Sequence, residues 1–287
     1  MTNLASAIDA KFDDRPVTVI EQKSEFATLD TKEIWRFREL IVFLVWRDLK
    51  VRYKQTFLGV TWAFLQPLMM VLMLSVTFSK WAKIPSENIP YPLFVFSGVL
   101  VWNFFISAAR SSVNSITSSA ALISKVYFPR LLCPTAAVVA AFADFIVAAF
   151  LFIPLALHYD VSVTFSGLLL SIGIVAGVGL FSLGFGLWLG PINARFRDVS
   201  QVLPFAFQLW MYATPIIYPF NLVPEAYRKY MLLNPMVGYI EGMRSGLLGK
   251  PLHAMSLYWA LGITVLFVVT GLFFFQNREP HLADYLG

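Results

Sequence analysis

The chain has 287 residues, of which 58% are hydrophobic and 14% are charged, and its formal net charge is +5. Soluble domains contain about 45–50% apolar and about 25% charged residues, so this composition argues against an ordinary water-soluble fold. The single cysteine, Cys133, excludes a disulfide within the sequence.

Five stretches of the sequence contain no Asp, Glu, Lys or Arg, and each exceeds the roughly 20 helical residues that cross a bilayer. A sixth is interrupted only by Asp144. Because a helix satisfies its own backbone hydrogen bonds in lipid, we predict an all-α integral membrane protein with six transmembrane helices. They form one domain over 33–275. The predicted spans are about 56–79, 91–110, 131–157, 165–190, 199–218 and 254–275.

The N-terminal region changes character at residue 33. Residues 1–32 are polar and of mixed charge, which predicts a cytoplasmic tail. Residues 33–55 combine apolar side chains at helical spacing with many cations, and they include Trp35 and Trp46. That mixture is typical of an amphipathic helix in the headgroup region, with the tryptophans as anchors. A solvated helix beside the membrane is the alternative.

Lys and Arg residues indicate the orientation. If the N-terminus is inside and six spans follow, 16 of the 22 Lys and Arg residues lie in interior segments. The positive-inside rule therefore predicts that both termini are cytoplasmic, including the tail 276–287.

The interior connection 111–130 has small polar residues, then apolar residues at helical spacing, and a stop at Pro129. This pattern predicts a short amphipathic helix along the cytoplasmic face. A helical continuation of the second span is the alternative.

The exterior connection 219–250 is too apolar for a polar loop. Pro224 suits the first turn of a short helix, and Asn234 and Gly249 suit the start and the end of a second one. We predict two short re-entrant helices that are buried against the spans.

Motifs of catalysis are missing from the sequence. It contains no Gly-x-x-x-x-Gly-Lys-[Ser/Thr], no nucleophile with a credible base, and no His cluster at metal-ligand spacing. We therefore expect a chain that is not itself an enzyme and binds no metal or cofactor. Asp144, deep in a predicted span, either pairs with another residue or lines a polar path.

Aromatic residues make up 16% of the chain and are plentiful in the spans. Most are expected to pack against lipid or other helices. A subset that faced an internal conduit would stack on the apolar faces of sugar rings. The candidates are Phe57, Trp62, Phe64, Phe207, Trp210 and Tyr212.

Five segments in order resemble one family, the permease subunits of polysaccharide-exporting ABC transporters, and most closely the O-antigen exporters. Exporters of capsule and teichoic acid are the next relatives. The matching segments are RDLKVRYKQTFLGV at 47–60, ISKVYFPRLL at 123–132, NARFRDV at 193–199, ATPIIYP at 213–219 and LNPMVGYIEGMRSGLLG at 233–249.

The resemblance implies a type-2 ABC exporter fold. It implies a homodimer that works with two copies of a separate ATPase, which binds ATP and Mg. The implied substrate is a polysaccharide on undecaprenyl diphosphate, moved from the cytoplasm to the periplasm across the bacterial inner membrane, without nucleic acid. Some partners in the family carry an added carbohydrate-binding domain and others lack it, and the sequence favours neither.

The resemblance also implies three groups of site residues. Cations at the end of the 33–55 helix would attract the diphosphate, although binding of anionic lipid headgroups alone would use the same charges. The 111–130 segment would dock into the ATPase, and the exterior helices would close the conduit. The gate cations are Arg47, Lys50, Arg52 and Lys54, the coupling residues are Lys125, Tyr127, Phe128 and Arg130, and the exterior gate residues are Tyr227, Tyr239 and Met243.

Two other functions were weighed. An exporter of small molecules or drugs would not need a basic helix that attracts phosphate. A membrane glycosyltransferase would need acidic residues near the membrane face, and the interior acids, chiefly Asp48 and Asp198, are isolated in the sequence.

Overall fold

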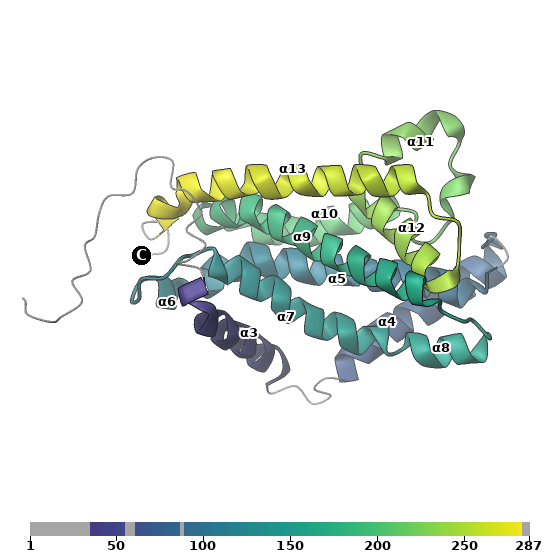
Figure 1. The fold of residues 1–287 in the computed structure, drawn as a ribbon, viewed down its shortest axis with the longest axis horizontal. Helices are drawn as coiled ribbons and strands as arrows, with labels where there is room; N and C mark the ends of the chain where they lie inside the picture. Colours follow the sequence, from purple (N-terminus) through teal and green to yellow (C-terminus); the bar gives the residue numbers. More distant parts are fainter. Residues whose placement is uncertain (1–34, 55–60, 87–88, 283–287) are drawn as a thin grey trace, which may run out of the picture. The chain divides into compact units, whose positions relative to one another are not determined.

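The computed structural model describes residues 35–54, 61–86 and 89–282. Every regular element in these ranges is a helix (Figure 1). The predicted all-α class is therefore confirmed. The predicted tail 1–32, Phe57 in the first span and the last five residues lie outside the described ranges.

Within the described ranges, five helical stretches are long and apolar enough to cross a membrane. They are Thr61–Trp81, made of α4 (Thr61–Leu74) and the π-helical η1 (Ser75–Trp81); α5 (Tyr91–Ser118); Leu132–His158, made of α7 (Leu132–Ala149) and α8 (Phe152–His158); α9 (Phe165–Arg195); and Ala254–His281, made of α13 (Ala254–Arg278) and η3 (Glu279–His281). The remaining elements are α3 (Arg38–Tyr53), α6 (Ala120–Ile123), α10 (Asp198–Tyr212), η2 (Phe220–Leu222), α11 (Glu225–Met231) and α12 (Pro235–Leu248).

The second predicted span is longer than expected. α5 continues past residue 110 to Ser118, and only Ala120–Ile123 forms a separate helix, α6. The 28 residues of α5 measure about 42 Å at 1.5 Å per residue, against a hydrocarbon core of about 30 Å. The expected surface helix over 111–130 is therefore wrong for 111–118, where the alternative of a continued span holds.

The fifth predicted span, 199–218, is shorter than expected. α10 has 15 residues, contains Pro204 and ends at Tyr212, so it is only about 22 Å long. The segment 213–219 that follows is irregular and mostly buried. Irregular backbone is tolerated at membrane depth where protein covers it. α10 and this segment together therefore occupy the region that was predicted as one long helix.

Successive long helices run in opposite directions, so the connections gather at two ends (Figure 1). One end, here the α6 end, holds α6, the α9–α10 junction and the last turn of α13. The other, here the α11 end, holds α8, α11 and the first turn of α13.

α5 is the centre of the bundle and packs against α4, α7, α9, α10 and α12. An aromatic cluster joins it to α9 and α10. The ring of Phe105 lies 5.4 Å from Phe181, 5.6 Å from Phe207 and 5.1 Å from Trp210, centroid to centroid. Such offset and edge-on pairs add to the stability that burial of the rings supplies.

α9 and α13 touch backbone to backbone at Gly184. A Cβ on Gly184 would lie 2.9 Å from the carbonyl carbon of Phe267. Small residues allow this approach between membrane helices, so any larger side chain at Gly184 would push α13 away.

Candidate functional site

α3 lies along α7 and presents two different faces (Figure 1). Leu44 is fully buried against the bundle, whereas Val42, Phe43 and Trp46 are at least 58% exposed. An apolar outer face beside cations suits a helix that rests in the headgroup region.

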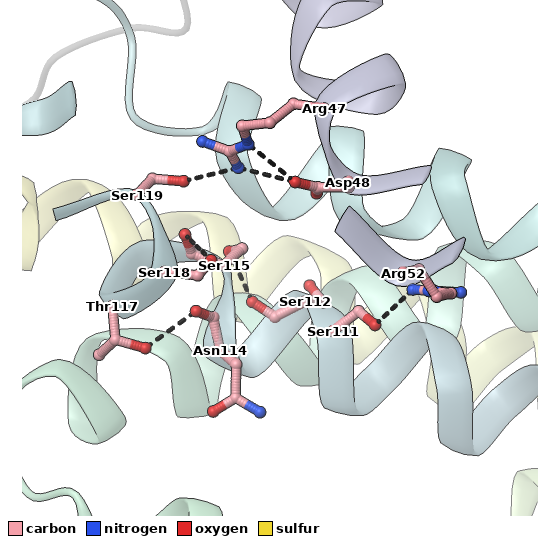
Figure 2. Close-up of polar contacts among 10 residues, drawn as sticks. All are labelled: Arg47, Asp48, Arg52, Ser111, Ser112, Asn114, Ser115, Thr117, Ser118 and Ser119. Carbon is pink, nitrogen blue, oxygen red and sulfur yellow. Dashed lines mark hydrogen bonds and ion pairs between the residues drawn. The ribbon is translucent and has the colours of Figure 1, made fainter. Parts of the chain in front are cut away.

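Arg47 fastens α3 to the α6 end of α5. Its guanidinium donates to the carboxylate of Asp48 at 2.8 and 3.0 Å and to the hydroxyl of Ser119 at 3.1 Å (Figure 2). Ser119 separates α5 from α6. The side chain of Arg47 is therefore half-buried and held against the protein.

Arg52, one turn further along α3, pairs with Asp144 of α7. The guanidinium also donates to the hydroxyls of Ser111 at 3.1 Å (Figure 2) and Ser107 at 3.5 Å. The hydroxyl of Tyr53 donates to the same carboxylate. Burial raises the pKa of Tyr53, although the charge of Arg52 lowers it in part, so the phenol keeps the proton that it donates. Of the two interpretations of Asp144, the structure favours pairing.

The four predicted gate cations therefore divide into two pairs. Arg47 and Arg52 bind groups of this chain, whereas Lys50 and Lys54 are exposed. Lys54 immediately precedes residues 55–60, which lie outside the described ranges. Of the four predicted gate cations, Lys50 and Lys54 are therefore the exposed ones, at the end of α3.

The predicted coupling residues surround a hollow beyond α6. Residues 123–128 and Arg130 line a cavity of about 230 Å³. Tyr127 is 74% exposed, and Lys125 is exposed beside it. An exposed tyrosine at an open hollow is suited to contact with a protein surface.

The other two coupling residues hold the hollow in shape. Phe128 is 3% exposed and packs with α3 and α7. The backbone N–H of Arg130 donates to the Glu279 carboxylate at 3.0 Å, and its guanidinium donates to the Glu279 carbonyl. Phe128 and Arg130 therefore fix the loop against α7 and the end of α13.

A polar cluster joins the α9–α10 junction to α5. The hydroxyl of Ser200 donates to the side-chain oxygens of Asn114 and Asn193, both at 2.6 Å. The amide of Asn193 also donates to Asn114 at 3.1 Å. The first turn of α10 is therefore tied to the serine-rich half of α5.

The aromatic conduit candidates do not share one surface. Phe207 is 1% exposed, so it does not border open space in this subunit. Trp210 is half-buried and packs against the same ring, Phe105, in the aromatic cluster. Phe64 is half-buried. Trp62 and Tyr212 are 51% and 59% exposed, and they alone among the described candidates reach the surface freely.

The exposed face of α10 carries a pattern that the candidate set missed. Gln201, Phe205, Gln208 and Tyr212 are all exposed and lie at spacings of three and four residues, which places them in one stripe. An amide side chain that faced lipid would lose its hydrogen bonds to water, which costs free energy. This stripe, here the α10 stripe, is therefore suited to face water, a sugar or another subunit.

α4 carries a similar face. Trp62, Leu65, Gln66 and Met69 line a hollow of about 470 Å³ on its surface. As on the α10 stripe, an exposed amide lies beside an exposed aromatic ring.

The exterior gate candidates also separate. α12 begins with Asn234 as its cap, ends at Gly249 in the left-handed region (φ 68°) and is buried among α5, α9 and α13. Tyr239 and Met243 lie on it and are at most 1% exposed, whereas Tyr227 on α11 is 64% exposed. Of the two expected re-entrant helices, α12 is buried and α11 is not.

α12 also holds an ion pair that lies wholly inside the protein. Arg244 and Glu241 are 0% and 5% exposed, and Nη1 lies 2.7 Å from the carboxylate. The guanidinium lies 3.6 Å from the centre of the Phe94 ring, and Nη2 donates to the Ile216 carbonyl at 2.8 Å. Ionisable groups buried in membrane proteins usually have a functional reason.

Residues 39–248 match the model of the family described as ABC-2 type transporter. The chain belongs to this family. It is thus a multi-pass membrane permease, and the five long helices fit that assignment.

Three curated relatives are similar to this chain over most of their length. The chain is 30% identical to an O-antigen export system permease protein of Myxococcus xanthus, covering 88% of this chain and 97% of the relative. It is 27% identical to a protein of the same name in Klebsiella pneumoniae, covering 86% and 95%. It is 25% identical to a polysialic acid transport protein of Escherichia coli, covering 81% and 91%.

In this ABC-2 permease the sequence interpretation missed Glu241 and Arg244 as a pair. Arg244 is one of the six Lys and Arg residues that fall outside the predicted interior segments. The available signal was an acid three residues before a base on a predicted helix, a spacing at which side chains meet. The same spacing joins Glu225 and Arg228 on the exposed α11, so it predicts a pair but not whether the pair is buried.

Proposed function

We propose that this permease subunit exports a polysaccharide of the O-antigen type, carried on undecaprenyl diphosphate, from the cytoplasm to the periplasm. It acts as a homodimer with two copies of a separate ATPase. The observation that carries the proposal is similarity over nearly the whole chain to O-antigen export permeases of two bacteria. The α6 end faces the cytoplasm in this proposal, in keeping with the distribution of Lys and Arg.

The hollow at residues 123–130 is the proposed docking site of the ATPase. Its rim offers Tyr127 and Lys125, and its floor is fixed by Phe128 and the Arg130–Glu279 contact. An exposed rim on a buried, hydrogen-bonded base is suited to transmit a movement of the ATPase to the bundle.

Lys50 and Lys54 are the proposed attraction site for the diphosphate. They are exposed at the end of α3, and cations near a membrane surface attract anionic headgroups at about 1 kcal/mol each. Arg47 and Arg52 have a different role in this proposal. They hold α3 on the bundle through Ser119 and Asp144.

The α10 stripe and the exposed face of α4 are the proposed lining of the conduit and of the contact between two subunits. Gln201 and Gln208 donate and accept hydrogen bonds to sugar hydroxyls, while Phe205 and Tyr212 stack on sugar rings. Such contacts tolerate many sequences of sugars, which suits a path that a polymer moves through.

A capsular polymer is the second candidate cargo, because the polysialic acid transport protein is also a relative over 81% of the chain. A small molecule or drug is a third. The amides of the α10 stripe favour a hydrated, sugar-like cargo over an apolar drug.

Deletion of the gene in its own bacterium tests the proposal. We expect lipid-linked O-antigen to accumulate at the inner membrane and to disappear from the surface, with recovery when the intact gene is restored. Loss of capsule with normal O-antigen would assign the second cargo. Normal surface levels of both polymers would refute polysaccharide export.

A further inference from the structure

The segment 213–219 determines where the outer end of α10 lies. α10 itself buries only Leu203 and Phe207. By contrast, Thr214, Ile216 and Ile217 are at most 7% exposed. A helix with two buried residues in 15 is held chiefly at its ends. At the α6 end the tie is the Asn114–Asn193–Ser200 cluster, and at the α11 end it is this segment.

Because the segment is irregular and buried, its backbone carbonyls need partners from other elements. The Ile216 carbonyl accepts from Arg244 at 2.8 Å, and the Ile217 carbonyl accepts from the hydroxyl of Tyr91 at 2.8 Å. The hydroxyl of Thr214 accepts from the amide of Asn234 at 2.9 Å. The segment is thus attached to α12 and to the first turn of α5.

Among these three contacts, the one from Arg244 is charged. Its guanidinium lies between Phe94 of α5, Glu241 of its own helix and the Ile216 carbonyl. Glu241 and Arg244 are three residues apart on α12, so they move together. If the segment leaves, the ion pair remains and only the bond to the carbonyl is lost. A buried charge is costly to leave without a partner, and this arrangement avoids that cost.

We propose that Arg244 is a releasable latch on the outer end of α10. Its bond to the Ile216 carbonyl holds the closed position, and Glu241 keeps the guanidinium neutralised when the segment moves away. The inference rests on the proposed function only in assuming that a conduit runs beside α10. Arg244 is a positioning residue in this role, because it acts through the segment and not on the cargo.

The two halves of the ion pair then have opposite effects. Glu241→Gln with Arg244→Met removes both charges together and also the bond to Ile216. The segment then keeps only its contacts with Tyr91 and Asn234, so the outer end is held less firmly and the conduit leaks. Glu241→Gln alone removes the carboxylate, so the Ile216 carbonyl becomes a more important partner of the buried guanidinium. The segment is then held more strongly, and the outer end opens less often. A pair that served stability alone would instead make Glu241→Gln the more damaging variant, because it leaves a buried guanidinium without its carboxylate.

Potassium efflux from vesicles measures how well the conduit is closed to ions, and the measurement needs no cargo. The permease and its partner ATPase are purified as one complex and placed, without ATP, in phosphatidylethanolamine–phosphatidylglycerol vesicles loaded with potassium chloride. We expect the double variant to release potassium about tenfold faster than wild type or more, as loss of a hydrogen bond from a charged group allows. We expect Glu241→Gln to release it no faster than wild type, and to export its polymer in cells more slowly.

The chain contains a matched control. Arg228 on α11 also lies three residues after an acid, Glu225, and donates to two backbone carbonyls at 2.9 Å. Unlike Arg244, it is part of a surface helix. Glu225→Gln with Arg228→Met should therefore leave potassium efflux at the wild-type rate.

Wild-type efflux from the double variant, in an intact complex, would overturn the latch. So would fast efflux from Glu241→Gln. If the double variant does not assemble, Arg244→Lys decides, because one ammonium cannot hold both the carboxylate and the carbonyl in the forked geometry. Efflux from it must exceed that of wild type. The efflux measurements use no polysaccharide, so a wrong cargo would leave their outcome unchanged.

Discussion

Arg52 and Asp144 are 92 residues apart in the sequence and form an ion pair between α3 and α7. The pair joins α3 to the bundle, with two serines of α5 beside the guanidinium. It also explains why the acid is tolerated within a predicted span.

The first prediction concerns this pair. Asp144→Asn should lower the free energy of unfolding by about 1–3 kcal/mol, because a partly buried guanidinium loses its charged partner. Thermal unfolding in detergent, followed by tryptophan fluorescence, measures the change. Exchange of the two residues, Arg52→Asp with Asp144→Arg, should recover part of the loss, and an exchange worse than Asp144→Asn would contradict the pairing.

A second prediction separates the exposed cations of α3 from the paired ones. Lys50→Glu with Lys54→Glu should reduce polymer export several-fold, because about 1 kcal/mol of attraction to anionic groups is lost at each site and replaced by repulsion. Thermal stability should not change, since both side chains are exposed. Surface polymer in cells and unfolding in detergent are the two measurements. Full export from this variant would remove the lysines from the proposed gate.

The third prediction distinguishes the rim of the coupling hollow from its floor. Tyr127→Ala should weaken binding of the ATPase and uncouple its activity from export, with little effect on stability, because the ring is 74% exposed. Phe128→Ala should cost about 3–5 kcal/mol of stability, the usual result of emptying a buried aromatic site. Copurification of the ATPase and thermal unfolding separate the effects. Equal stability losses in both variants would contradict the assignment.

A fourth prediction concerns the two faces of α10. Gln208→Leu should keep the protein folded and lower export, because an exposed amide of the proposed conduit is lost. Phe207→Ala, one position away, should instead destabilise the protein by about 3 kcal/mol or more, because it opens a hole in the aromatic cluster. Export per folded molecule should therefore fall in the first variant only. A normal export rate for Gln208→Leu would place the conduit elsewhere.

The helix ends at α12 were predictable because caps are local. Asn234 and Gly249 lie at its start and end as expected, since an amide that accepts from Met236 N–H and a left-handed backbone need no distant partner. The length of α5 was not predictable in this way. Its serine-rich half suggested a break, but those serines donate to carbonyls of their own helix, as Ser115 and Ser118 do (Figure 2), and α5 continues.

The functional side chains were less predictable, because their roles depend on distant contacts. α10 is apolar on most sides, so periodicity did not show that Phe205 faces outward while Phe207 faces the core. Arg47 and Arg52 looked equivalent to Lys50 and Lys54 in the sequence. Their partners, Ser119 and Asp144, come from other helices and are brought close only by the fold.

One unbroken helix, α5, contacts both the α6 hollow and the exterior ion pair. Phe94 near its start lies under Arg244, and Ser118 at its end adjoins α6, about 36 Å away at 1.5 Å per residue. Its one proline, Pro92, is in the first turn, where it does not kink a helix. α5 is therefore a stiff helix that connects the two ends of the bundle. In the proposed function, a tilt of α5 imposed by the ATPase at the α6 hollow would move the ring of Phe94 relative to the guanidinium of Arg244.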